Sequence, residues 1–138
     1  MYEVEIKINF RAGHRLLPPY EGHCNNPHGE GYTAILLFKN KELDKNGMVF
    51  DFGNIKRQIK KWIDDNWDHS YIHHKDDEVG EYLRLNGFRT FKMNTNPTAE
   101  YMAQYLFIYL KHEYPELYKV GIVESFVDSI AWYEGDFK

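Results

Sequence analysis

Hydrophobic and polar residues alternate at the start of the chain. Over residues 2–10 every second position is apolar, and these positions are Tyr2, Val4, Ile6, Ile8 and Phe10. A period of two predicts a β-strand. "YTAILLFK" at 32–39 predicts a second strand, antiparallel to the first in a hairpin. Residues 11–31 lack periodicity and contain several prolines and glycines, which predicts a long loop of a kind uncommon without a function.

The apolar spacing then changes to that of helices. In 51–66 it predicts a helix capped by Asp51, with the apolar positions Phe52, Ile55, Ile59, Trp62 and Ile63. Segment 67–95 is mixed and polar, and we expect it to be mostly irregular. "NPTAE" predicts a second helix with Asn96 as cap and Pro97 at the first helical position, and its apolar stripe is Ala99, Met102, Ala103, Leu106, Tyr109 and Leu110.

Two further strands are predicted near the C-terminus. Val120, Ile122, Glu124 and Phe126 would share one strand face, and residues 129–134 would form the last strand. The order β-β-α-α-β-β predicts an α+β fold, an antiparallel four-stranded sheet with both helices on one face. The 138 residues suit a single domain over 1–138. Two exposed sheet edges favour oligomerisation.

Composition narrows the partners and the compartment. The formal net charge of −4 argues against a nucleic-acid binder or an anionic-membrane binder. A single cysteine cannot form an internal disulfide, which suits a reducing compartment. No segment resembles a signal peptide or a membrane span. We therefore expect a soluble, cytoplasmic domain.

Candidate chemistry gathers in the predicted loop, at His14, Cys24, His28 and Glu30. His28 and Glu30 are two residues apart at the entry to a strand and would point the same way, and the hairpin could bring His14 opposite them. Three such ligands with an open position are typical of catalytic zinc, although loop histidines are often merely solvated. The Cys24 thiol would be reactive beside a metal or an imidazole, and inert if it is only buried.

Two other places carry titratable residues. Asp68 and His69 could form a proton relay or lie at the surface, and we interpret His73 and His74 as solvent-facing. Glu124 falls on an apolar strand face, where an unpaired carboxylate is costly. A ligand with two adjacent N–H donors, such as a pterin or guanine, would match it, and so would a structural salt bridge.

Together these residues resemble the 6-pyruvoyltetrahydropterin synthase / 6-carboxytetrahydropterin synthase family. The matching pieces occur in the family's order across nearly the whole chain, and they are "FRAGH", "CNNPHGE", "GMVFDF", "DH", "NPTAE" and "VES". The resemblance implies the tunnelling fold (T-fold). It also implies a trimer or a hexamer of two stacked trimers, with active sites between subunits.

The resemblance also implies residue roles. His14 and His28 fall on zinc (Zn²⁺) positions, Cys24 on the catalytic thiol, and Asp68 and His69 on its partners. The remaining implied residues bind the pterin: Glu124 anchors its ring, and Thr98 and Glu100 lie near its pocket.

Glu30 departs from the family's usual His-Gly-His. A carboxylate can ligate zinc, so the site could consist of two histidines and Glu30. Alternatively His23 could be the third ligand, or the metal could be lost in a non-catalytic paralogue.

The activity implied by the resemblance is that of a zinc-dependent lyase acting on 7,8-dihydroneopterin triphosphate. Its product would be 6-carboxy-5,6,7,8-tetrahydropterin, used in queuosine synthesis, or 6-pyruvoyltetrahydropterin, used in tetrahydrobiopterin synthesis. The compact chain favours the carboxy product. The alternatives are a non-catalytic pterin-binding protein and a cyclohydrolase-like enzyme acting on GTP.

Overall fold

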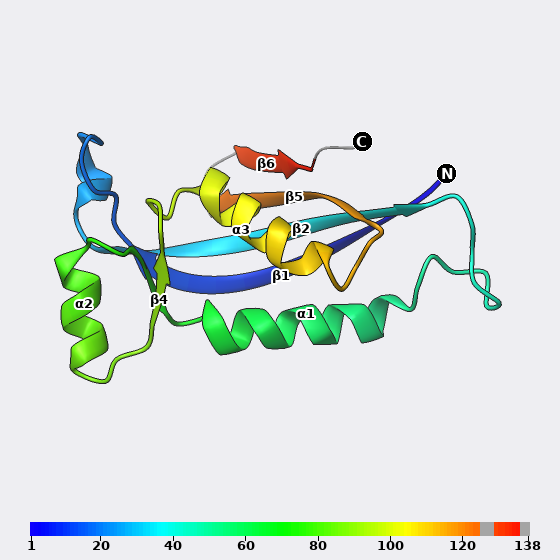
Figure 1. The fold of residues 1–138 in the computed structure, drawn as a ribbon, viewed down its shortest axis with the longest axis horizontal. Helices are drawn as coiled ribbons and strands as arrows, with labels where there is room; N and C mark the ends of the chain where they lie inside the picture. The colour runs from blue at the N-terminus through cyan, green and yellow to red at the C-terminus, as the bar shows by residue number, and fades with distance from the viewer. Residues whose placement is uncertain (125–128, 136–138) are drawn as a thin grey trace.

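A computed structural model describes residues 1–124 and 129–135. Its centre is a long hairpin of β1 (Tyr2–His14) and β2 (His28–Asn40), which runs across the molecule (Figure 1). The two strands pair antiparallel from Tyr2↔Asn40 to His14↔His28. The predicted hairpin is confirmed, but both strands continue further than the alternation indicated. The connecting loop is therefore shorter than 11–31, and the two histidines face each other across the ladder.

The rest of the sheet is larger than predicted. β5 (Leu117–Glu124) pairs antiparallel with β2, and β6 (Ile130–Glu134) pairs antiparallel with β5. On the other side β3 (Tyr71–His74) is parallel to β1, and β4 (Thr90–Met93) is parallel to β3. In the described chain the order is β4-β3-β1-β2-β5-β6, a mixed sheet of six strands. The α+β class is confirmed, and the four-stranded antiparallel description is wrong.

The error lies in segment 67–95, predicted as mostly irregular. It contains β3, the helix α2 (Glu78–Leu85) and β4. Each of the two strands has four residues, too few for an alternation to be recognised. Asp77 caps α2 by accepting a hydrogen bond from the Val79 amide.

Both predicted helices are present. α1 (Phe52–Asn66) begins after Asp51, whose carboxylate accepts from the Gly53 and Asn54 amides, so that cap is confirmed. α3 (Ala99–Lys111) begins two residues later than expected from Pro97. Its cap is the Thr98 hydroxyl, which accepts from the Tyr101 amide, and the prediction of Asn96 is wrong. The Asn96 side chain instead bonds to the backbone of Leu17 in a distant loop.

The core lies between one face of the sheet and the two helices α1 and α3, which meets the expectation that both cover the same face. Helix residues Ile59, Ile63, Met102 and Leu106 belong to one cluster with strand residues that include Ile6, Ile8, Phe10, Tyr32, Leu36, Phe38, Val120 and Ile122. The predicted apolar stripes were wrong at Phe52 and Tyr109, which are exposed, while Phe107 is buried. Phe126 lies outside the described residues.

The interpretation of His73 as solvent-facing was also wrong. Its side chain is fully buried on β3, and its ring lies against Gly80 of α2. His74 is only half-buried. His73 is covered by α2, an element that the polar composition of 67–95 did not predict.

Candidate metal centre and pocket

The end of the hairpin far from the N-terminus brings His14, His28 and Glu30 together. All three lie on the strand face that turns toward the helices, since they continue the alternation of the buried core residues. One ligand atom from each lies within 4.8 Å of the others. The rings of His14 and His28 are 4.5 Å apart, and His28 Nε2 is 3.3 Å from Glu30 Oε1. This geometry brings together a possible metal site of two imidazoles and one carboxylate.

Backbone carbonyls hold both imidazoles with Nε2 toward the cluster. His14 Nδ1 donates to the Pro97 carbonyl at 2.9 Å, and His28 Nδ1 donates to the Asn26 carbonyl at 2.7 Å. Because a carbonyl only accepts, each Nδ1 carries the proton and each Nε2 keeps a lone pair. His28 Nε2 is buried and makes no hydrogen bond among the described residues, since its neighbour at 3.3 Å, Glu30 Oε1, is an acceptor like the unprotonated nitrogen itself. This orphaned nitrogen fits a metal ligand.

Burial also favours the neutral form of His14, which is the form that binds metals. The imidazole is 3% exposed, and desolvation lowers its pKa despite the opposing hydrogen bond to Pro97. Tyr32, whose hydroxyl is 3.2 Å from His14 Nδ1 and 3.3 Å from Nε2, has a raised pKa because it too is buried, next to Glu124 and Glu30. The phenol therefore stays neutral beside the cluster.

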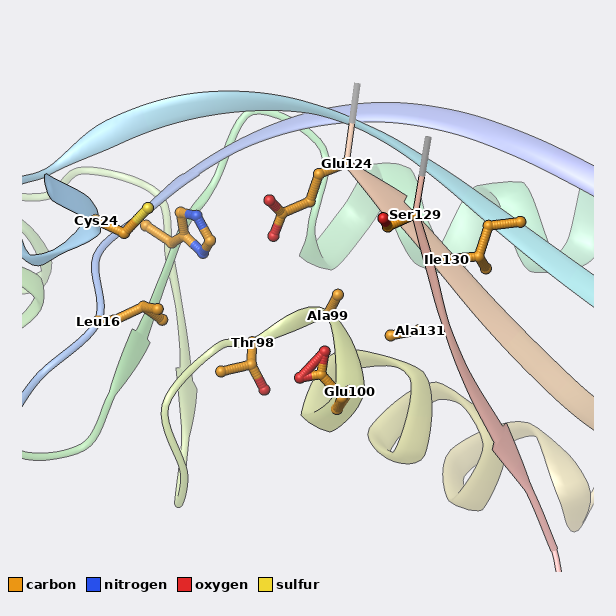
Figure 2. A pocket seen from close by; sticks show the side chains of 10 residues that line it. Leu16, Cys24, Thr98, Ala99, Glu100, Glu124, Ser129, Ile130 and Ala131 are labelled. Carbon is orange, nitrogen blue, oxygen red and sulfur yellow. The ribbon is translucent and has the colours of Figure 1, made fainter. Parts of the chain in front are cut away.

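A cavity of about 290 Å³ opens next to His14. Cys24 and Glu124 line it with Thr98 and Glu100, and Figure 2 shows the Cys24 sulfur and the Glu124 carboxylate directed toward the same space. Burial raises the pKa of Glu124, an effect that His28 opposes and Glu100 reinforces. No lysine or arginine lines this cavity among the described residues. It is suited to a ligand that donates hydrogen bonds to carboxylates.

The remaining lining residues come from the start of α3. The Thr98 hydroxyl is 3.2 Å from the Tyr101 amide that it caps, so its oxygen is already engaged. Glu100 lies in the first helical turn, close enough to Glu124 to affect its pKa. Cys24 reaches the cavity from the short 3-10 helix η1 (His23–Asn25). His23, the alternative third ligand, is outside the described cluster that could hold a metal.

Asp68 and His69 are not at this cavity. They line a separate one of about 1190 Å³ with Arg11 and Gly13, residues on the opposite face of the hairpin. The Asp68 carboxylate accepts from the Arg11 amide at 2.9 Å and is 2.9 Å from His69 Nδ1. These bonds outweigh the effect of burial and hold the pKa of Asp68 below its usual value. His69 adopts a φ of 61° and its side chain is 77% exposed.

Comparison with known proteins identifies the family. The model of the family described as 6-pyruvoyl tetrahydropterin synthase matches residues 3–136. The chain belongs to this family. A curated relative from Rickettsia felis, named 6-carboxy-5,6,7,8-tetrahydropterin synthase, is 41% identical, covering 97% of this chain and 94% of its own. One of the same name from Haemophilus influenzae is 30% identical over 82% and 84% of the two chains.

Solved structures that share the fold of this chain include a 6-pyruvoyl tetrahydropterin synthase. The Caenorhabditis elegans 6-pyruvoyl tetrahydropterin synthase has a TM-score of 0.72 at 28% identity, covering 98% of this chain and 96% of its own. An uncharacterized protein from Wolinella succinogenes, WS1659, shares the fold with a TM-score of 0.83 at 21% identity, covering 98% of both chains. The predicted resemblance and the lyase class are confirmed. None of the described helices is long and apolar enough to cross a membrane.

The sequence did not predict the contacts that Asn96, Pro97 and Tyr32 make around the site. Pro97 acts through its carbonyl, which carries no side-chain signal, and Tyr32 was read only as an apolar strand residue. The "NP" pair correctly indicated that a helix begins nearby, but the Asn96 side-chain amide bonds to Leu17 instead of capping that helix. Only the three-dimensional pairing shows these roles.

Proposed function

We propose that this chain is a zinc-dependent 6-carboxy-5,6,7,8-tetrahydropterin synthase acting on 7,8-dihydroneopterin triphosphate. The observation that carries the proposal is the His14–His28–Glu30 cluster beside a cavity that also presents Cys24 and Glu124. The names of the curated relatives favour the carboxy product over the pyruvoyl product. The enzyme would serve queuosine synthesis in the cytoplasm as a single-domain subunit of a homo-oligomer.

The metal would be held by Nε2 of His14, Nε2 of His28 and the Glu30 carboxylate. When bound, zinc supplies Lewis-acid polarisation of substrate side-chain oxygens, weakened by the negative charge of Glu30. The carbonyls of Pro97 and Asn26 keep both imidazoles in the ligating tautomer before metal arrives. Two histidines and one carboxylate with an open position form a ligand set that occurs in catalytic zinc sites.

The carboxylates of the cavity would recognise the pterin ring. The adjacent N–H donors of the aminopyrimidine edge match the two oxygens of an ionised Glu124. Glu100 adds a second acceptor in the same cavity. The raised pKa of Glu124 means that burial makes its charged form costly, and N–H donors that bind the carboxylate would offset this cost, which favours ligands with two N–H groups over neutral apolar ones.

Proton transfer would fall to Cys24, with the Asp68–His69 pair of a neighbouring subunit. As a thiolate, Cys24 would take a proton from the substrate side chain, and His69, held by Asp68, would move protons at the side-chain oxygens. Within one chain the pair lines a different cavity from Cys24, and His69 is exposed, as a group serving a neighbouring copy would be. This supports a trimer or hexamer with sites between subunits.

The test is incubation of the zinc-loaded protein with 7,8-dihydroneopterin triphosphate and identification of the products by mass spectrometry. The proposal predicts 6-carboxy-5,6,7,8-tetrahydropterin together with acetaldehyde and triphosphate. The pyruvoyl product would overturn the assigned product. Pterin binding without turnover would indicate a binding protein, and formate released from GTP would indicate a cyclohydrolase-like enzyme.

A further inference from the structure

The side chain of Asn96 joins two segments that lie 79 residues apart in sequence. Its Oδ1 accepts from the Leu17 amide at 2.9 Å, and its Nδ2 donates to the Leu17 carbonyl at 3.0 Å. A carboxamide therefore satisfies both backbone groups of one loop residue, as a neighbouring strand would. A side chain needs an acceptor and a donor side by side to do so, and asparagine offers both.

Leu17 is connected in turn to the segment that carries the thiol. The adjacent Leu16 amide donates to the Cys24 carbonyl at 2.7 Å. The Asn25 side chain donates to the Leu16 carbonyl at 3.0 Å. The backbone at 16–17 is thus bonded on one side to the Cys24 turn and on the other to Asn96, so the position of the thiol depends on both sets of bonds.

Asn96 is followed in the chain by residues that contact the metal cluster and line the cavity. The next residue, Pro97, is buried and accepts the hydrogen bond from His14 Nδ1. Thr98 then caps α3, whose first turn carries Glu100 into the cavity. The backbone at 96–98 therefore holds the His14 imidazole in place. The Asn96 side chain connects the Cys24 segment to this same backbone.

We propose that Asn96 is a positioning residue that fixes the Cys24 thiol relative to the metal cluster. It touches neither the thiol nor the cluster and acts through Leu17 and Leu16. Its effect on turnover rests on the proposed function, whereas its effect on the position and exposure of the thiol does not. His14 keeps its own bond to a backbone carbonyl, so loss of the Asn96 side chain should leave the metal site intact.

The experiment compares Asn96→Ala with wild type in the zinc-loaded protein, with Asn86→Ala as the matched control. Asn86 also donates from its side-chain amide to a backbone carbonyl, that of Tyr82, but at the exposed end of α2. The alkylation rate by iodoacetamide reports the thiol directly, because Cys24 is the only cysteine. Zinc content, circular dichroism, kcat and KM complete the measurement.

For Asn96→Ala we expect a severalfold faster alkylation, because the half-buried thiol loses its tether. Zinc content and helical signal should stay as in wild type, and kcat should fall about 10–100-fold with little change in KM. Asn86→Ala should change none of these. Asn96→Asp, which keeps the shape and removes the donor, replaces the alanine variant if the latter does not fold.

An alkylation rate and a kcat equal to wild type would overturn the proposal. So would loss of zinc and helical signal in both Asn96 variants, which would make Asn96 a residue required for folding only. A faster alkylation in a protein that shows no turnover even as wild type would uphold the positioning role and refute the proposed function instead.

Discussion

At the scale of single residues, Glu30 sets the character of the cluster. Its carboxylate lies 3.3 Å from His28 Nε2 and shares the helix-facing side of the hairpin with both imidazoles. A carboxylate brings a negative charge to the divalent ion, which a neutral imidazole does not, and so leaves the ion a poorer electron acceptor. The carboxylate thus supplies a third ligand beside the two imidazoles.

Replacement of Cys24 by alanine distinguishes a catalytic role of the thiol from a structural one. In Cys24→Ala we expect an unchanged fold and zinc content, since Cys24 is not in the His14–His28–Glu30 cluster. The loss of the proposed base should lower kcat by about 10²–10⁴-fold. Steady-state kinetics with 7,8-dihydroneopterin triphosphate measures this, with His23→Ala as a neighbouring control. Near-normal turnover of Cys24→Ala would refute the role of the thiol.

The raised pKa of Glu124 predicts a pH dependence. Burial and the Glu100 charge keep this carboxyl protonated up to a higher pH than an ordinary glutamate, although His28 opposes them. A protonated carboxyl cannot accept two pterin N–H groups, so kcat/KM should fall as pH decreases through the raised pKa. In Glu100→Gln the pKa of Glu124 should decrease, which moves the acid limb of the kcat/KM profile to lower pH. An acid limb that stays in place, or moves to higher pH, would contradict this coupling.

Several site residues were predictable because their signals lie in short sequence patterns. The spacing of His28 and Glu30 at a strand entry places them on one face, and the hairpin places His14 opposite. The hydrogen bonds that orient the imidazoles were not predictable, because they end on backbone carbonyls of Asn26 and Pro97. No side-chain pattern reports such acceptors.

At the scale of elements, long and regular segments were predictable and short ones were not. The hairpin and both long helices follow from periods of two and of three to four residues. β3 and β4 have four residues each; β3 pairs with β1, β4 pairs with β3, and both contact α2. Such strands depend on tertiary partners, so the local sequence of 67–95 carried too little signal.

The contact between α2 and β3 predicts a destabilising substitution. A Cβ at Gly80 would lie 2.2 Å from Cγ and Nδ1 of the fully buried His73. Gly80→Ala should therefore lower the free energy of unfolding by about 1–3 kcal/mol, although alanine favours helices. Urea unfolding at fixed protein concentration measures the change.

Gly29→Ala is the control for this substitution, because a Cβ at Gly29 meets nothing within 4 Å. It should leave the free energy of unfolding close to that of wild type. A Gly80→Ala protein as stable as wild type would show that His73 and α2 separate without cost.

At the scale of the whole molecule, the predicted catalytic and pterin-binding residues lie in two different cavities. Cys24 and Glu124 share one, and Asp68 and His69 share the other. Sequence order could not reveal this, because Asp68 and His69 lie between α1 and β3, where no strand alternation indicates the direction of a side chain. The separation is the reason to propose that copies of the chain complete each other's sites.

A subunit-mixing experiment tests this arrangement. Cys24→Ala and His69→Ala should each be nearly inactive, whereas co-expression of the two should restore function at about a quarter of the sites in a symmetric oligomer. Co-expression of Cys24→Ala with Glu124→Gln is the control. It should restore nothing, because those residues line one cavity of the same chain. Recovery in the control but not in the test pair would contradict a site shared between subunits.

The central claim is that His14, His28 and Glu30 form the metal centre of a pterin enzyme. The most direct test is anomalous diffraction from crystals of the zinc-loaded protein, recorded above the zinc absorption edge. We expect one peak per chain, about 2.0–2.2 Å from Nε2 of both histidines and from a Glu30 oxygen. A peak ligated by His23 with Glu30 turned away, or no peak at this cluster, would contradict it.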